Sequence, residues 1–355
     1  MSNSEIKNLS VTGMYVHTYD DVNGDNTGGV YWDGGSNNSI HDCTFSNEKF
    51  GAFFVYPGGA TSSNISMYRN TVSNVSWGLV VGDGNASSTL TGTNSIHDND
   101  ISTFLPWDST SAHDYYHHDG IFVFAGGAGS TAGGVQVYNN YIHGDCGTTG
   151  TAGVYLSGQS GLVNSALVFN NVIHPSANFW NDGLVYFFFA PHTGFYTNTL
   201  IGQSSSDSNS GMDIQGSSPA NIRDNIFMNM AQAIYFADGS VTLDASDHND
   251  YFGDGELVQI HAGANYNTLT GWQAVSGSYD AASSSGNPNL TSGNVPNAGS
   301  PVIGLGANLS SLSIGALDVD KAGTARPGTG TWDAGAYQHA SGGSGIPDRS
   351  QRIMN

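Results

Sequence analysis

Charged residues are scarce in this chain, and basic residues are the scarcest. Of the 355 residues only 10% are charged, and Lys plus Arg number 8 against 29 Asp plus Glu, a formal net charge of −21. Nucleic acids and anionic membrane surfaces bind to basic patches, so this composition argues against both as partners. It fits an uncharged partner, or an acidic one that a metal ion neutralises. The polar, lysine-poor composition also predicts a secreted, extracellular protein.

Cysteine is nearly absent, and long apolar runs are absent altogether. The two cysteines, Cys43 and Cys146, should lie about three coils apart in the repeat described below, or roughly 14 Å at about 4.8 Å per strand step. A disulfide needs Cα atoms within about 7 Å, so we predict no bridge, with Cys43 as a small buried filler. No apolar run approaches the length of about 18 residues that a membrane span needs.

The chain instead contains a repeat of short strands and turns. Residues 120–142 show one unit: an alternating apolar strand, a Gly-rich turn, and a second strand that ends in a pair of asparagines. The first strand recurs, headed by Gly or Ala, at positions 29, 51, 78, 120, 153, 183, 211 and 233, at intervals mostly of about 22 to 33 residues. A strand-and-turn repeat of this length predicts stacked coils.

Stacking is what would give these coils a core, since each coil alone leaves its apolar face in water. One inward position per coil is expected, at Val30, Ala52, Leu79, Ile121, Val154, Leu184, Met212 and Ile234. The recurring asparagines should form hydrogen bonds along the stack and satisfy turn backbone that sheet pairing leaves open.

These repeats resemble the right-handed parallel β-helix superfamily, the pectate-lyase-like proteins, over residues 5 to 255. The resemblance implies an all-β fold, a right-handed parallel β-helix solenoid of about eight to ten coils with an irregular C-terminal cap. We expect the β-helix over residues 1–252, a capping segment packed on it over 253–340, and a flexible tail over 341–355. The resemblance says little about activity, because the fold carries lyases, hydrolases, epimerases, tailspikes and adhesins.

The densest group of chemically versatile residues lies in the one sizeable insertion, residues 101–119. Within it stand Trp107, Tyr115, Tyr116, His117, His118 and Asp119. Loops that leave a rigid scaffold often carry function. These side chains suit metal binding, acid–base catalysis or sugar binding, and their spacing does not choose among the three. An ordered polar loop without chemistry is the alternative.

Three aspartates are predicted to share one face of the solenoid. Asp182 directly precedes its strand glycine, which predicts the same register as Asp119, two coils away and about 9.6 Å distant. That separation is close to the roughly 6.5–9.5 Å between acid and base in inverting glycosidases. Asp213 should point outward one coil further on. The alternative is three independent surface carboxylates in an acidic protein.

An aromatic row is predicted on the outward face of the same strands. Its positions are Tyr31, Phe53, Val80, Phe122, Tyr155, Val185, Asp213 and Tyr235, with Trp77, Trp107 and Trp180 close in register. An apolar patch of this size marks an interaction surface, and sugar rings stack on such surfaces. The alternatives are ring stacking that stabilises the solenoid, or coverage by the loop or by a second copy in a homo-oligomer.

Two further features bear on metal and substrate binding. Asp21, Asn23 and Asp25 have the alternate spacing by which short loops bind calcium through oxygen ligands, with a plain Asx-rich turn as the alternative. Lys49 follows Glu48 just before a strand, and we interpret it either as a substrate-binding residue or as half of a local surface ion pair.

Two classes of function follow from these features. The first is a secreted, carbohydrate-active enzyme that cleaves a polysaccharide in a groove along the β-helix face. Hydrolysis would use the paired aspartates, whereas a polysaccharide lyase would use Lys49, or His117 and His118 with a neighbouring tyrosine. The second class is a non-catalytic, glycan-binding or structural β-helix such as an adhesin or tailspike.

Overall fold

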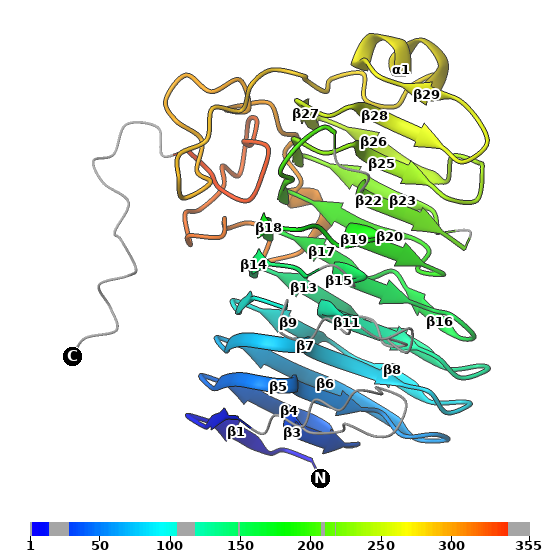
Figure 1. The fold of residues 1–355 in the computed structure, drawn as a ribbon, viewed down its shortest axis with the longest axis vertical. Helices are drawn as coiled ribbons and strands as arrows, with labels where there is room; N and C mark the ends of the chain where they lie inside the picture. The colour runs from blue at the N-terminus through cyan, green and yellow to red at the C-terminus, as the bar shows by residue number, and fades with distance from the viewer. Residues whose placement is uncertain are drawn as a thin grey trace.

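The protein is an all-β solenoid whose parallel strands stack along its long axis (Figure 1). The computed structural model describes residues 2–13, 28–104, 118–147, 150–206, 210–216 and 218–339. Each coil contributes strands to three parallel ladders, so that a strand pairs with its counterparts one coil before and one coil after. This connectivity is that of a parallel β-solenoid, as the repeat predicts.

The first ladder runs along the corner where the asparagines stand. Its strands are β2 (Ser10–Thr12), β5 (Thr44–Val55), β7 (Thr71–Asp83), β10 (Asp100–Ser102), β14 (Tyr141–Asp145), β18 (Val172–Ala177), β21 (Thr199–Ile201), β24 (Ile226–Met228) and β27 (Asp250–Phe252). The long strands β5 and β7 continue past this corner into the second ladder.

The second ladder carries the Gly-headed strands. Besides β5 and β7 it contains β3 (Gly28–Asp33), β11 (Asp119–Ala125), β15 (Ala152–Ser157), β19 (Gly183–Phe188), β22 (Ser210–Gln215), β25 (Gln232–Phe236) and β28 (Glu256–Ile260). Beyond it, β29 (Asn265–Tyr266) pairs with β28 in the antiparallel sense.

The third ladder is a separate 12-stranded sheet. Nine of its strands follow the coils in order: β1 (Glu5–Lys7), β4 (Ser36–His41), β6 (Thr61–Tyr68), β9 (Asn94–His97), β13 (Val135–Tyr138), β17 (Leu167–Phe169), β20 (Thr193–Tyr196), β23 (Ala220–Arg223) and β26 (Leu243–Asp247). Three short strands extend the sheet sideways from β6: β8 (Thr89–Thr91), β12 (Thr131–Gly133) and β16 (Leu162–Asn164).

A continuous apolar core runs between the ladders. The inward row of the second ladder is Val30, Ala52, Leu79, Ile121, Val154, Val185, Met212, Ile234 and Val258. The prediction is correct except in one coil, where Val185 and not Leu184 occupies the position. Gly183 explains the difference, because it has a φ of 125° and forms a turn with Trp180, which shifts the strand by one residue.

The other strand glycines allow the coils to approach each other closely. A Cβ on Gly78 would lie 2.1 Å from the carbonyl oxygen of Gly120 and 2.8 Å from Cγ2 of Ile101. Neither contact can be relieved without moving backbone or core, so glycine is required here by close approach and not by backbone conformation.

The recurring asparagines form one hydrogen-bonded ladder, as predicted. Each Nδ2 donates to the Oδ1 of the asparagine one coil on, at 2.9–3.1 Å. The same Oδ1 also accepts from the backbone N–H of that donor residue. The members are Asn70, Asn99, Asn140, Asn171, Asn198, Asn225 and Asn249, all buried. Because each polar atom is paired, burial of the row carries little desolvation cost.

The ladder has a different residue at each end. At its start, Cys43 takes the asparagine position, and its N–H donates to Oδ1 of Asn70. At its far end Asn249 donates to a buried carboxylate, Asp280. Asp280 accepts further hydrogen bonds at 2.7–3.1 Å from Ser246, Tyr251, Trp272 and Ser283.

The C-terminal segment covers both the end and one flank of the solenoid (Figure 1). At the end, helix α1 (Leu269–Ser276) inserts Trp272 into the core. Residues 286–339, which include the 3₁₀ turn η3 (Ser310–Leu312), lie against the corner between the third and the first ladder. There Trp332 packs in a cluster with Phe169 and Tyr196, and buried Arg326 donates to Oδ1 of Asn170.

Both cysteines are free and buried, which confirms the predicted absence of a disulfide between Cys43 and Cys146. Within the ranges given above, no helix is both long enough and apolar enough to cross a membrane.

Candidate functional site

The outward positions of the second ladder form the row that the sequence predicts, with one correction. Strand pairing aligns Tyr31, Phe53, Val80, Phe122, Tyr155, Tyr186, Asp213 and Tyr235, a set we call the aromatic row. The predicted member Val185 points into the core, and Tyr186 takes its place because of the one-residue shift at Gly183.

Ring stacking holds the centre of the aromatic row together. The ring centroids of Phe122 and Tyr155 lie 4.9 Å apart, and those of Tyr155 and Tyr186 lie 4.8 Å apart, with interplanar angles of 12° and 5°. These three rings are buried, whereas Tyr31 at the first coil is 61% exposed. The row is therefore most open at its N-terminal end, and its centre is a stacked, buried cluster.

A second row lies just before the aromatic row in each coil, and we call it the polar row. It consists of Lys49, Ser76, His118, Thr151 and Asp182. The N–H of Thr151 donates to the carbonyl of His118 at 2.9 Å, and that of Asp182 donates to the carbonyl of Thr151 at 3.0 Å. Ser76 Oγ lies 2.7 Å from His118 Nδ1. All members except Asp182 are buried.

This register corrects the predicted position of Asp182. Asp182 stacks in the row of His118, whereas Asp119 pairs with Trp77 on one side and with Ala152 on the other. The predicted alignment of Asp119 with Asp182 is therefore wrong by one residue. The turn at Gly183 is again the cause, since it places glycine, not aspartate, opposite Ala152.

The three predicted aspartates nevertheless influence one another electrostatically, and we call them the acidic cluster. Burial, and then the charges of Asp182 and Asp238, raise the pKa of Asp213 to about 8. Burial raises the pKa of Asp182 as well. The pKa of Asp119 is raised well above its usual range, first by burial and then by the charge of Asp182, although the N–H of Ala152 donates to its Oδ1 at 3.0 Å.

The three carboxyl groups differ in their exposure to solvent. Asp119 is fully buried, Asp213 is 7% exposed, and Asp182 is the most open to solvent. Among the described residues, Asp213 Oδ1 and Asp119 Oδ2 have no hydrogen-bond partner. Burial without compensating cations is the arrangement that keeps a carboxylic acid protonated near neutral pH.

Lys49 and Glu48 are both buried, which contradicts the surface position that the ion-pair alternative gave them. The Nζ of Lys49 lies 5.6 Å from the ring centroid of Trp77, a cation–π contact. Glu48 is fully buried, and burial raises its pKa to about 7.

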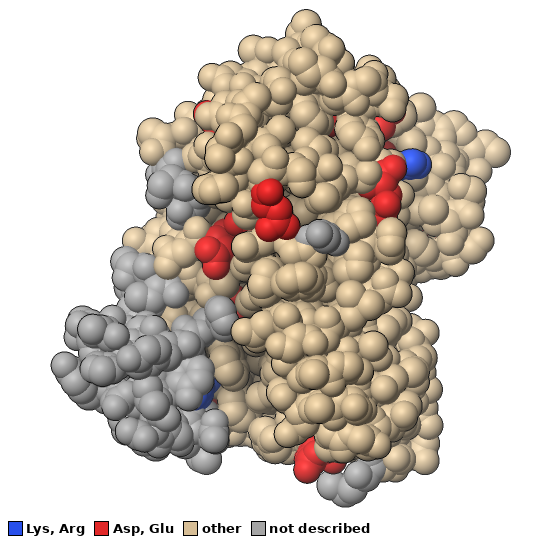
Figure 2. Space-filling model, turned by 90° about the vertical axis from the view of Figure 1, so that its right-hand side faces the viewer, with Lys and Arg blue, Asp and Glu red and all other residues tan. Residues whose placement is uncertain are grey.

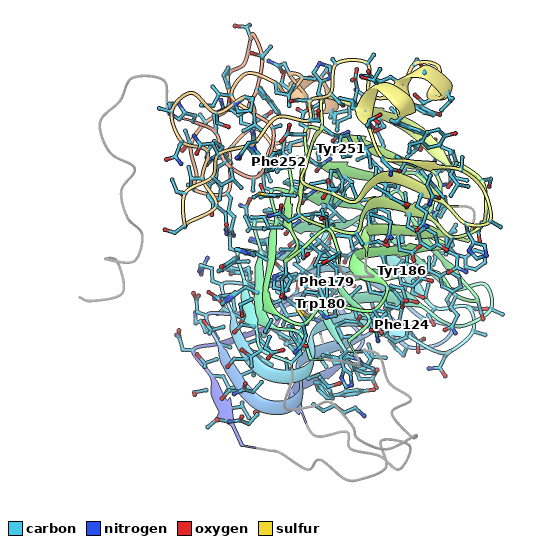
Figure 3. All side chains as sticks on the ribbon, turned by 45° about the horizontal axis from the view of Figure 1, so that its top comes forward. Phe124, Phe179, Trp180, Tyr186, Tyr251 and Phe252 are labelled. Atoms are coloured by element: carbon cyan, nitrogen blue, oxygen red, sulfur yellow. The ribbon has the colours of Figure 1, made fainter. Side chains whose placement is uncertain are left out.

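Trp180 was predicted to stand beside the aromatic row, and this is wrong. Its side chain, labelled in Figure 3, is fully buried in the core and packs against Phe104 with ring centroids 5.4 Å apart. The turn to Gly183 directs it inward, so it has no surface on which a sugar could stack.

Several predicted site residues lie outside the described residues. These are Trp107, Tyr115, Tyr116 and His117 of the insertion, and the proposed calcium ligands Asp21, Asn23 and Asp25. Within the described part of the chain, no three His, Cys, Asp or Glu side chains are grouped so as to hold a metal ion.

Sequence reasoning missed three residues near the acidic cluster. Tyr186 donates a hydrogen bond to Oε1 of Gln215, and Asp238 accepts one from the N–H of Gly216 at 2.6 Å. Aligning coils by their tyrosines, and not by their glycines, would have placed Tyr186 opposite Tyr155. Asp238 follows its strand in a turn, where an aspartate is ordinary, so no sequence signal distinguishes it.

Most of the surface is uncharged, in keeping with the composition; on the side seen in Figure 2, acidic side chains occur in a few separate places. Neither protein-family models nor curated protein sequences match this chain. The class of protein is therefore defined by its fold and site: a parallel β-solenoid with buried acidic groups beside an outward aromatic row.

Proposed function

We propose that this protein is a secreted, carbohydrate-active enzyme that hydrolyses a polysaccharide along the second ladder. We also propose that its solenoid is the right-handed parallel β-helix of the pectate-lyase-like superfamily, with about eight to ten coils and a C-terminal cap. The observation that carries the proposal is the acidic cluster, in which Asp213 has a pKa of about 8 beside the more open Asp182.

Glycoside hydrolysis needs one protonated and one ionised carboxyl group. Asp213 suits the general acid, because it keeps its proton at neutral pH and donates it to the leaving oxygen. Asp182 suits the general base, because it is more exposed and can activate a water molecule. Asp119 is fully buried, so we assign it no contact with substrate; its Oδ1 accepts the N–H of Ala152, which gives it a structural role in the ladder.

The exposed end of the aromatic row and the net charge of the chain indicate the class of substrate. The exposed ring of Tyr31 and the half-buried ring of Phe53 offer apolar surface to sugar faces at one end of the aromatic row. The net charge of −21 disfavours a polyanion without a bridging cation. A predominantly neutral polysaccharide is therefore the proposed substrate. Calcium bound by Asp21, Asn23 and Asp25 remains a prediction, which a chelator-dependent loss of thermal stability would support.

A lyase is the second candidate, favoured by the placement of Lys49 and His118 in one polar row. β-Elimination needs a base to remove a proton next to a carboxylate, together with positive charge to neutralise that carboxylate. His118 is oriented by Ser76, and Lys49 supplies the positive charge two coils away. A non-catalytic glycan-binding protein that associates through the aromatic row is the remaining alternative.

A product assay on a polysaccharide panel separates these functions. Hydrolysis releases reducing ends without ultraviolet-absorbing unsaturated sugars, and Asp213→Asn should reduce it about 10²- to 10⁴-fold while Lys49→Met retains it. Elimination produces unsaturated sugars, and the sensitivities of these two variants should be reversed. If intact protein binds a glycan but releases no product from any polymer, with or without calcium, the enzymatic proposal is refuted.

A further inference from the structure

The aromatic row is buried where it meets the acidic cluster. Tyr186 stacks against Tyr155 and is only 8% exposed, so little of its ring is open to a sugar. Tyr31, the exposed member of the row, lies six strand steps from Asp213, roughly 29 Å at about 4.8 Å per step. A polysaccharide held at the acidic cluster therefore needs another binding surface close by.

Such a surface lies at the end of the strand that carries Tyr186. Phe188 stands two residues after Tyr186 and so points to the same side of the strand, with the two ring centroids 5.9 Å apart. The ring centroid of Phe189 follows at 4.7 Å from that of Phe188. Phe188 is half-buried, and Phe189 is 38% exposed. Among the described Phe, Tyr and Trp residues, only Phe189 and Tyr31 are exposed.

The backbone of Phe189 is strained. Its φ is 51°, in the left-handed region that bulky residues rarely adopt, and of the described non-glycine residues with positive φ it alone has a large apolar side chain. The adjacent coils leave room for it: a Cβ on Gly158 would lie 2.8 Å from the Cβ of Phe189, and one on Gly216 would lie 2.8 Å from its ring. A costly conformation that keeps a ring exposed beside a candidate site points to a use for that ring.

Hydrogen-bonding groups stand beside the two rings. Gln215 pairs with Phe188 one coil on. Its Oε1 accepts from the hydroxyl of Tyr186, which orients the amide, and its Nε2 donates to no described residue. Asp238 accepts from the N–H of Gly216 at 2.6 Å and is an exposed acceptor. Sugar hydroxyls both donate and accept, so an amide and a carboxylate beside an aromatic surface suit a sugar unit. The acidic groups nearby would repel an anion, which favours an uncharged one.

We propose that Phe188 and Phe189 form a sugar-binding subsite beside the acidic cluster, with the ring of Phe189 as the surface on which one neutral unit of the polysaccharide stacks. Phe189 lies three residues along the chain from Tyr186, about 10 Å at roughly 3.3 Å per residue, so nearby units of one polysaccharide chain can reach both this ring and Asp213. Here the polysaccharide crosses from the second ladder towards the third. The inference rests on the proposed function for its substrate, but binding can be tested without cleavage.

Affinity electrophoresis of Asp213→Asn measures binding almost without turnover, in gels that contain dextran, laminarin, galactomannan or arabinan. On the polymer that binds, adding Phe189→Ala should raise the dissociation constant about tenfold, whereas Phe189→Tyr keeps a ring and should bind as well as its parent. Phe189→Gly should lose binding as Phe189→Ala does. It should also melt at a higher temperature than Phe189→Ala, because glycine adopts a φ of 51° without strain.

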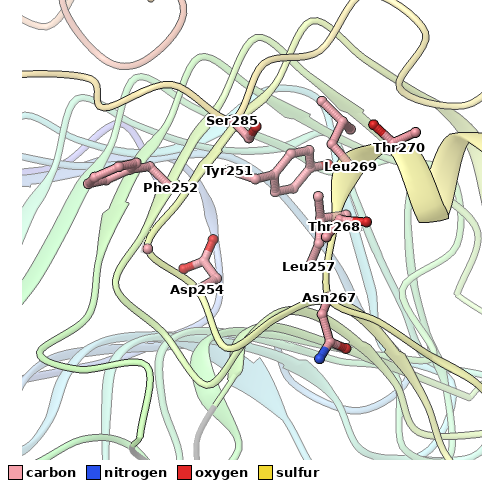
Figure 4. A pocket seen from close by; sticks show the side chains of 10 residues that line it. Tyr251, Phe252, Asp254, Leu257, Asn267, Thr268, Leu269, Thr270 and Ser285 are labelled. Carbon is pink, nitrogen blue, oxygen red and sulfur yellow. The ribbon is translucent and has the colours of Figure 1, made fainter.

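Kinetics on the protein with Asp213 intact provide a second readout. Phe189→Ala should raise KM for the cleaved polymer about tenfold with little change in kcat, which is the pattern of lost substrate binding. Phe252→Ala is the matched control. It removes a half-buried phenylalanine that lines a cavity at the C-terminal end of the solenoid (Figure 4), and it should change neither binding nor KM.

The outcomes distinguish this inference from the proposed hydrolysis. If a polymer binds through Phe189 but none is cleaved, the sugar subsite stands and hydrolysis is refuted. If a polymer is cleaved and folded Phe189→Ala keeps the KM and dissociation constant of its parent, hydrolysis stands and the inference is overturned. A purely structural role for Phe189 would give this second result together with a lower melting temperature. The inference is also overturned if no neutral polymer binds.

Discussion

Replacing Asp213 by asparagine should make the stability of the folded protein less dependent on pH, and should at the same time reduce hydrolysis. Asparagine has nearly the same shape as aspartic acid but cannot ionise. In the folded protein the pKa of Asp213 is about 8, against an ordinary value of 3.8. Between those two pH values the unfolded chain has lost the proton that the folded chain still holds. The stability of the folded state must therefore fall as pH rises through this window.

The size of the effect follows from the same shift. Each tenfold change in an acid constant corresponds to about 1.4 kcal/mol, so the cost to the folded state above pH 8 is at most about 6 kcal/mol. Water and small side-chain movements relieve part of this cost, and we expect about 2–4 kcal/mol in practice. In a chain of 355 residues that is a difference of roughly 3–5 °C in melting temperature.

Circular dichroism melts from pH 5 to pH 9 provide the measurement. The melting temperature of the unaltered protein should fall across this range, and that of Asp213→Asn should fall less. Asp33→Asn, which alters an exposed carboxylate, should follow the unaltered protein. Loss of the general acid should at the same time reduce hydrolysis about 10²- to 10⁴-fold. Parallel melting curves, or full activity in Asp213→Asn, would refute the reasoning.

Three further predictions test the core and the ladders. Asn140→Leu leaves polar groups unpaired on both adjacent coils and should lower the free energy of unfolding by about 3–5 kcal/mol in a urea titration; a smaller loss would mean that water replaces the amide. Trp180→Ala should cost about 3–5 kcal/mol through a cavity beside Phe104, with glycan binding by the folded protein unchanged. Because burial raises the pKa of both thiols, Cys43 and Cys146 should react with a thiol reagent only after unfolding, and rapid reaction of native protein would contradict this.

The repeat could be predicted from the sequence because every coil that stacks on its neighbours needs the same kinds of residue at the same positions. An inward apolar residue, a close-approach glycine and a corner asparagine recur for physical reasons that do not depend on distant contacts. The sequence predicts the wrong positions for Leu184 and Asp182 because glycine stands at the head of these strands for two different structural reasons. Gly78 lacks a Cβ because a neighbouring coil is too close, whereas Gly183 adopts a positive φ in a turn. The sequence does not distinguish these two uses.

Burial of the aromatic row could not be derived from strand alternation. Alternation assigns Tyr155 to the outward side, and strand pairing agrees, yet the ring is only 4% exposed. The missing information is which neighbours stand around the row, and that depends on the tertiary structure. The same holds for Asp119 and Glu48, whose full burial changes what their carboxyl groups can do.

The asparagine ladder has a direction, because every amide accepts from the coil before it and donates to the coil after it. An additional coil inserted between Asn70 and Asn249 would present the same acceptor to one neighbour and the same donor to the other. The two ends differ, since the last amide donates to Asp280, a carboxylate whose position is also fixed by donors from Ser246, Tyr251, Trp272 and Ser283. Tandem duplication of an internal coil could therefore lengthen this protein without any change to the residues at either end of the ladder. A coil inserted between two internal coils should fold, whereas a coil inserted next to Asp280 should not.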